Sequence, residues 1–185
     1  MSRIIHLFEN PERFIVGTVG EPGDRTFFVQ AKAGRRLISV AVEKSQVLAL
    51  AERINFLIRE INKTNPELLR NKQPVDDKPM EAPIMEEFVV GIIGLIWLAD
   101  RELISMDFQA FDQSLISDDG LEVELLGEED EGPDLLRLVI TPSSAEIFAD
   151  RALKVVNAGR PPCIFCGLPL DARGHVCPRA NGYRR

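Results

Sequence analysis

A helical alternation of apolar and polar residues is clearest between Ser45 and Lys63. Its apolar positions recur at spacings of three and four and would share one side of a helix: Val47, Leu50, Ile54, Leu57 and Ile61. The charged residues of the segment fall on other sides of that helix. The pattern predicts an amphipathic helix over residues 45–63 with one buried face.

A second helix is predicted to open at Ser143. Ser143 and Glu146 have the spacing of a capping box, in which each side chain accepts a hydrogen bond from the other residue's backbone N–H. The buried stripe of this helix is predicted to contain Phe148, Ala152 and Val155 or Val156. Gly159, followed by Pro161 and Pro162, is expected to end the helix.

Shorter segments alternate with the period of a strand. Residues 26–31 and 36–42 are rich in β-branched and aromatic residues, and the turn between them contains Gly34. Glycine tolerates the backbone conformations of tight hairpin turns, so we expect an antiparallel hairpin here.

The chain also reads as two similar halves. Phe-Ile-Val-Gly-Thr-Val-Gly at residues 14–20 is echoed by Phe-Val-Val-Gly-Ile-Ile-Gly at residues 88–94. In each half, predicted strands precede one predicted helix. We therefore predict an α+β fold built from two pseudo-repeats, related by a pseudo-twofold axis that places both helices on a shared face of the sheet.

Four segments follow from this pattern. They are a first repeat at residues 1–62, a linker rich in proline and charge at 63–84, a second repeat at 85–158, and a tail at 159–185. The second repeat contains an acidic insertion at residues 117–134. Because that insertion lacks the carboxylate and glycine spacing of an EF-hand loop, a solvated acidic hairpin is the better interpretation.

The tail contains all three cysteines of the chain and one of its two histidines. Cys163 and Cys166 have the Cys-x-x-Cys spacing that directs two thiolates at one ion, and His175 and Cys177 follow after a short segment with glycine at both ends. This set predicts a zinc ribbon or zinc knuckle. Because protein groups would fill all of the ion's coordination positions, we expect structural zinc rather than catalytic zinc.

Other interpretations of the cysteines stay open. A redox Cys-x-x-Cys pair is typical of a strand–helix unit rather than a tail flanked by proline, and a disulfide framework needs an even number of cysteines. Unrelated thiols near a surface histidine are a further alternative. Zinc binding is favoured, although the sequence does not separate zinc from iron.

Charge divides unevenly along the chain, whose formal net charge is −7. Residues 151–185 contain seven lysines or arginines and one acidic residue, while residues 1–150 are strongly acidic. A basic tail can bind a polyanion, an acidic partner protein or the protein's own acidic body. No secretory signal is evident, and the longest apolar run, residues 88–99, is too short to span a bilayer. We expect a cytoplasmic protein.

The residues together resemble a known family. Arg-Phe-Ile-Val-Gly at residues 13–17, the Cys-x-x-Cys pair, and the ending His-Val-Cys-Pro-Arg-Ala-Asn-Gly-Tyr at residues 175–183 resemble an actinobacterial family of conserved proteins of unknown function. The resemblance covers nearly the whole chain. It implies a bacterial cytosolic protein with a metal-type motif at Cys163, Cys166, His175 and Cys177, and it implies no particular reaction.

We favour a non-enzymatic zinc-binding adaptor, whose tail presents a basic surface to a macromolecular partner through Arg173, Arg179, Arg184 and Arg185. The alternative is an enzyme or small-ligand protein with a pocket between the repeats, where the candidate polar groups are Asp24, Arg25, Asp100 and Arg101. A third possibility is nucleic-acid binding through the basic tail. His6 and the two Gly-x-x-Gly pairs are interpreted as structural.

Overall fold

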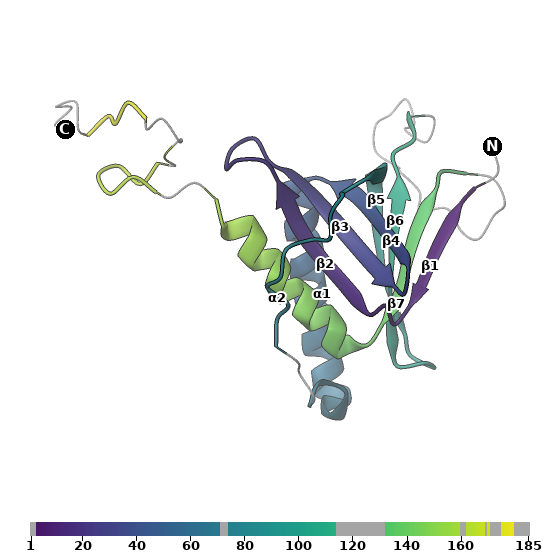
Figure 1. Cartoon of the computed structure of the whole chain (residues 1–185). Coiled ribbons are helices and arrows are strands. Elements are labelled where there is room, and N and C mark those ends of the chain that lie inside the picture. Colours follow the sequence, from purple (N-terminus) through teal and green to yellow (C-terminus); the bar gives the residue numbers. More distant parts are fainter. Residues whose placement is uncertain are drawn as a thin grey trace.

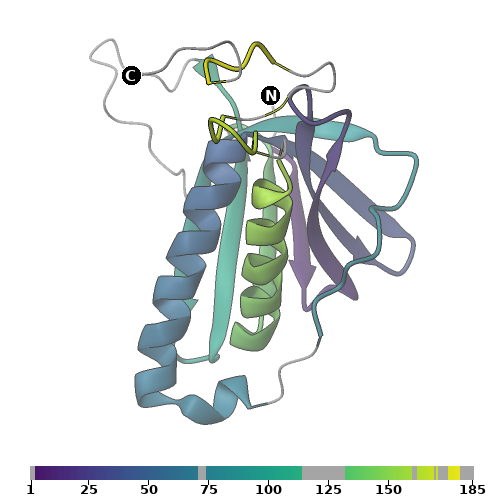
Figure 2. The ribbon, with the colours of Figure 1, turned by 90° about the vertical axis from the view of Figure 1, so that its left-hand side faces the viewer.

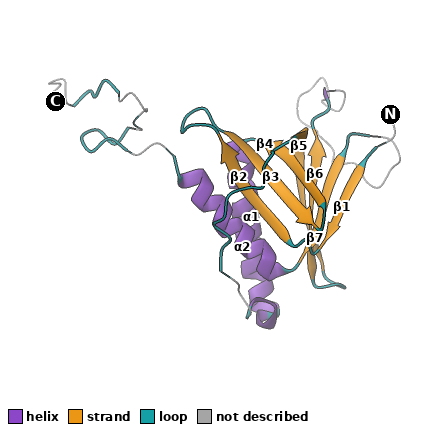
Figure 3. Cartoon of the chain, viewed as in Figure 1, coloured by secondary structure: helices purple, strands orange, loops and turns teal. Residues whose placement is uncertain are grey.

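The computed structural model describes residues 3–70, 74–113, 132–159, 162–168, 170 and 175–179. Its strands and helices (Figures 1 and 3) are β1 (Ile5–Glu9), β2 (Arg13–Val19), β3 (Thr26–Ala33), β4 (Arg36–Val42), α1 (Lys44–Thr64), the 3₁₀ helix η1 (Pro66–Leu69), β5 (Glu86–Leu98), β6 (Leu103–Ala110), β7 (Leu135–Ile140) and α2 (Pro142–Asn157). The predicted α+β class is confirmed. Most of the predicted acidic insertion at 117–134 lies outside the described residues.

The described strands form one seven-stranded sheet in the order β1-β7-β6-β5-β4-β3-β2. β2, β3 and β4 form one antiparallel meander, and β5, β6 and β7 form a second. The meanders meet through a parallel contact between β4 and β5, so they lie side by side in the same orientation. The predicted pseudo-twofold axis is therefore wrong, since it would reverse one meander. That the halves are duplicated units stays a prediction.

Both helices cover the same face of the sheet and pack against each other, as Figure 2 shows. The predicted stripe of α1 is buried at Val47, Leu50, Ile54 and Ile61, and the helix adds Ala51 and Ile58. Leu57 is only partly buried at the margin of the core. Helical periodicity thus located α1 to within one residue at each end.

The start of α2 differs from the sequence-based prediction. Thr141 is the N-cap, its hydroxyl accepts a hydrogen bond from the Ser144 N–H at 3.2 Å, and Ser143 already lies inside the helix. Pro142 explains the shift, because proline suits the first helical position, where no N–H partner is needed. The predicted buried stripe is confirmed at Phe148, Ala152 and Val156, and the helix ends at Asn157.

The predicted hairpin is confirmed. β3 pairs with β4 in antiparallel register from Phe27↔Val42 to Ala33↔Arg36, which leaves Gly34 and Arg35 in the turn. Gly34 has a φ of 58°, the left-handed region that glycine occupies at little cost.

Residues 74–85, here called the strap, pass beside α2 and then cross the opposite face of the sheet to β5 (Figure 1). The side-chain amide of Gln30 accepts from the Glu81 N–H at 2.8 Å and donates to its carbonyl oxygen at 3.1 Å. Lys32 forms an ion pair with the Glu81 carboxylate at 2.7 Å. Part of the segment predicted as a linker is therefore held on the sheet by polar side chains of β3.

Neither α1 nor α2, the α-helices in the described part of the chain, has an apolar stretch long enough to cross a membrane.

Candidate metal centre

The Cys163–Cys166 segment forms a tight turn beyond the end of α2. The Gly167 N–H donates to the Cys163 carbonyl oxygen at 2.8 Å, and the Cys163 N–H donates to the Leu168 carbonyl oxygen at 2.7 Å. Gly167 has a φ of 75°, so the chain can reverse immediately after Cys166 without a side-chain clash. Both cysteines consequently start from one compact loop.

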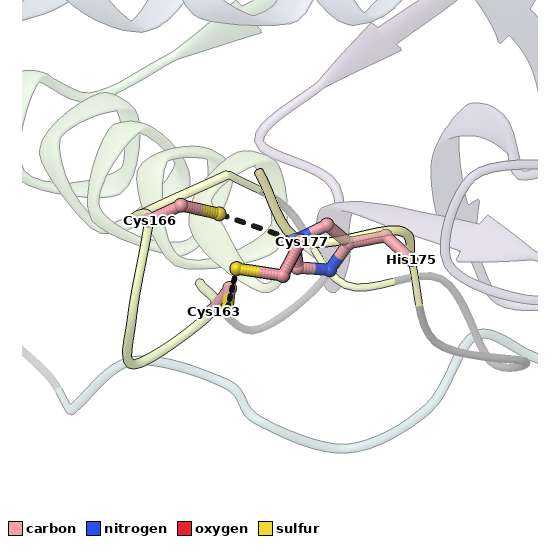
Figure 4. Close-up of side chains that lie close together, drawn as sticks. All are labelled: Cys163, Cys166, His175 and Cys177. Atoms are coloured by element: carbon pink, nitrogen blue, oxygen red, sulfur yellow. Dashed lines mark hydrogen bonds between the residues drawn. The ribbon is translucent and has the colours of Figure 1, made fainter. Parts of the chain in front are cut away.

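His175 and Cys177 face this loop, and one ligand atom from each of the four residues lies within 4.8 Å of all the others (Figure 4). The three cysteines are free thiols, and the Cys163 and Cys177 sulfurs are 3.8 Å apart. Two sulfurs on one tetrahedral zinc ion lie about 3.8 Å apart, whereas disulfide sulfurs lie about 2 Å apart. The spacing fits a shared metal ion rather than a disulfide.

The imidazole of His175 also faces a cysteine sulfur. His175 directs Nε2 to the Cys166 sulfur at 3.1 Å, so Nε2 is the ring nitrogen available to an ion. Cys163 and Cys177 are buried, while Cys166 and His175 are half-buried. Arg179 donates to the carbonyl oxygen of Phe165 at 3.1 Å, which ties the second ligand segment to the first loop.

Local hydrogen bonds favour a thiolate at Cys163. Backbone N–H groups of Cys166 and Phe165 point at its sulfur and lower the pKa of the Cys163 thiol. At Cys166, a hydrogen bond from the Leu168 N–H also lowers the thiol pKa. Burial and the neighbouring thiols of Cys177 and Cys163 raise it by more, so the pKa of Cys166 is raised overall. Crowded thiols disfavour several negative charges at once, and a bound cation removes that penalty.

The donor set therefore fits a metal ion. Three sulfurs and one imidazole nitrogen converge, and carboxylates, which hard cations prefer, are absent from the group. All four predicted metal-site residues are brought together. Of the four arginines predicted beside them, the described residues include only Arg179.

The alternative pocket residues are not brought together as one site. Arg25, in the turn between β2 and β3, donates to the Ala158 carbonyl oxygen at the end of α2. Arg101, in the turn between β5 and β6, pairs with Glu9 of β1 at 3.0 Å. Each arginine thus secures a different element of the fold.

The sequence interpretation missed the apolar residues of the metal loop. Four large side chains around the ligands are between 51% and 89% exposed: Ile164, Phe165, Leu168 and Val176. Large apolar residues in a short, polar tail that contains cysteines were the sequence feature that could have indicated this exposed surface. Because these four side chains are mostly exposed, they form part of the protein surface and do not form a hydrophobic core around the ligands.

Residues 6–177 match the protein family described as "Protein of unknown function (DUF3090)". The chain belongs to this family. The matched range of the DUF3090 chain includes both meanders, both helices and all four residues of the cysteine–histidine group. No curated protein and no solved structure is significantly similar to it.

Proposed function

We propose that this DUF3090 protein is a non-enzymatic adaptor, in which one structural zinc ion shapes a C-terminal surface that binds a partner protein. The observation that carries the proposal is the position of Ile164, Phe165, Leu168 and Val176, which are exposed on the same loops that supply the ligands.

The ligand set supports a structural role for the metal. Catalytic zinc usually has three protein ligands and an open position for water, whereas Cys163, Cys166, His175 and Cys177 supply four donors. Zinc is favoured over an iron–sulfur cluster because such clusters usually have cysteine at every position. Metal binding would also stabilise the tail, because Cys163 and Cys177 are the only buried residues in its described part.

The exposed apolar side chains support a protein partner. Several large apolar side chains exposed on one small loop region often mark an interaction site. Phe165 supplies an aromatic side chain of the kind enriched in the cores of protein interfaces, and Arg179 donates to its carbonyl oxygen. We infer a partner surface with an apolar pocket and an acidic rim.

The first experiment measures metal and stability. We expect about one zinc per chain by elemental analysis, since the site has one full ligand set. Cys166→Ser should lose the zinc while the main thermal transition of residues 3–159 is unchanged. Iron in place of zinc, or full zinc retention by Cys166→Ser, would contradict the metal assignment.

The second experiment tests partner binding. Phe165→Ser removes an aromatic side chain that is 58% exposed, and Phe111→Ser is a matched control with the same exposed fraction on the body of the protein. Crosslinking in cells of the source organism should yield a specific partner with the unmodified chain and with Phe111→Ser, but not with Phe165→Ser or Cys166→Ser. Capture that is identical for all four proteins would refute the adaptor role.

Nucleic-acid binding is the competing function of the basic tail. It predicts gel retardation of DNA or RNA that weakens steeply with salt and is insensitive to Phe165→Ser.

The cytoplasmic, actinobacterial setting expected from the sequence belongs to the proposal. Fluorescence microscopy of a tagged chain in such a host tests it.

A further inference from the structure

We propose that the edge of β5 from Ile92 to Leu98 pairs with the same edge of a second copy of the chain, forming a twofold dimer with a continuous sheet. The proposal rests on the sheet and α1 and is independent of the metal centre.

Among the described strands, β5 has a pairing partner on only one side over most of its length. It pairs with β6 through Leu98, but its parallel contact with β4 consists of Ser39↔Glu86 and Ala41↔Val89, with a register shift between them. No described strand pairs with the β4-side edge beyond Val89. Because the backbone groups of a strand alternate in direction, about half of those from Ile92 to Leu98 face this open side.

A side chain of α1 covers the start of this edge. Gln46 donates from its amide nitrogen to the carbonyl oxygens of Val90 and Gly91 at 3.2 and 3.1 Å. No corresponding bond to the edge is found among the described residues farther along β5. The open edge therefore begins where the contact from Gln46 ends.

The open edge also lacks the residues that normally protect a sheet from association. Its sequence, Ile-Ile-Gly-Leu-Ile-Trp-Leu, has no charge and no proline. The other free edges differ, because β1 is only five residues long and contains His6 and Glu9. At β2, the Val16 carbonyl oxygen accepts from Arg151 at 2.7 Å. Protection at two edges and its absence at the third indicates that the third is covered by a partner.

Apolar surface continues from the edge onto α1. Phe56 is 59% exposed and shares a hollow with Leu57, Leu95 and Trp97, and Figure 2 shows the strands of this part of the sheet passing behind α1. The same hollow contains one acidic residue, Glu52, and one basic residue, Arg53. Its charges balance, so the hollow itself adds no electrostatic repulsion between two copies.

A second copy is the occupant that fits these features. Antiparallel pairing centred on Leu95 places Ile93 opposite Trp97 of the other copy and Gly94 opposite Ile96, and directly opposed residues share a face of the sheet. Every resulting pair is uncharged, and the contact is self-complementary, as a twofold interface requires. Such a dimer would carry two metal tails and gain avidity for a repeated partner.

Sedimentation velocity of the full, zinc-loaded chain tests the proposal. We expect a dimer at about 100 µM chain, a concentration well above a micromolar dissociation constant. Ile96→Lys should weaken the dimer at least tenfold, because its two lysines would be diagonal neighbours about 7–8 Å apart across the twofold axis. Val19→Lys is the matched control, since Val19 and Ile96 are 46% and 47% exposed.

Hydrogen exchange identifies the contact itself. Amides in residues 92–98 should become more protected as chain concentration rises, while amides in β2 should not change. A monomer at all concentrations would overturn the proposal and leave the edge to an extended peptide of another protein. A dimer that survives Ile96→Lys, or one without protection at residues 92–98, would overturn it as well.

Discussion

Arg151 of α2 donates through Nε to the carbonyl oxygen of Val16 in β2 at 2.7 Å. Its Nη1 donates to the carbonyl oxygen of Asp76, and its Nη2 donates to that of Lys78 at 2.9 Å. One buried guanidinium thus connects a helix, an edge strand and the strap. Burial lowers the pKa of Arg151, but arginine titrates so far above neutrality that the group stays charged.

Replacing Arg151 with methionine should destabilise the protein by about 3 kcal/mol, because three backbone carbonyls lose a charged donor at once. Urea unfolding followed by circular dichroism measures this loss. Lys154→Met is the control on the same helix: Lys154 is exposed and pairs with Asp77 at 3.3 Å, so its loss should cost under about 0.5 kcal/mol. Equal effects of the two substitutions would contradict the connecting role of Arg151.

Asp76 should make stability depend on pH in the acid range. The hydrogen bonds from Arg13 hold the pKa of Asp76 below its ordinary value, so the folded state favours the carboxylate. This stabilisation is present above the unfolded pKa of about 4 and is lost as pH falls through the folded pKa. Asp76→Asn should therefore cost about 1 kcal/mol at pH 7 and progressively less below pH 4. A stability difference that does not change with pH would disprove this origin.

Gly17 and Met80 should behave as a coupled pair. A Cβ atom added at Gly17 would lie 2.7 Å from the Met80 side chain, which covers this part of β2. Because methionine is flexible, we expect Gly17→Ala to cost about 1–2 kcal/mol rather than prevent folding. In a Met80→Ala background the same substitution should cost much less. A double-mutant cycle with a coupling energy near zero would show that the two residues do not interact.

Gly167 should affect the stability of the metal loop only through its backbone conformation. An added Cβ meets no atom within 4 Å at Gly167, so the cost of Gly167→Ala comes from its φ of 75° and should be about 1 kcal/mol. Zinc affinity should then fall about five- to tenfold in a competition titration with a chelator, since 1.4 kcal/mol corresponds to a factor of ten.

Gly34→Ala is the matched control for this substitution, because Gly34 also has a positive φ and open space around it. It should lower the unfolding free energy of the body by a similar amount and leave zinc affinity unchanged. A loss of zinc affinity in Gly34→Ala would mean that the tail and the body do not act separately.

The elements that depend on local pattern were predictable. The period of Val47, Leu50 and Ile54 located α1, and Gly34 located a hairpin turn, because each depends on residues close together in the sequence. The metal group was predictable for the same reason: its four residues lie within a span of fifteen, and thiolate and imidazole have a specific chemistry.

Long-range relations were not predictable from local pattern. The parallel contact of β4 with β5 is inconsistent with the predicted pseudo-twofold axis between the two halves. Nothing near Ser39 or Val89 in the sequence specifies that pairing. The burial of Arg151 depends on carbonyl groups of β2 and the strap, which are more than seventy residues away. At Thr141, the preference of Pro142 for the first helical turn outweighed the capping box expected at Ser143.

The pairing of β1 with β7 also affects how the chain folds during synthesis. Ile5–Glu9 is made before its parallel partner, Leu135–Ile140, which emerges from the ribosome only after more than a hundred further residues. Until then, β1 lacks its native partner strand, and Phe8 cannot reach the buried position that it has in the folded protein. The β2–β3–β4 meander and α1 can assemble early, because their contacts are local. Closure of the sheet by β1 is therefore a late step in folding.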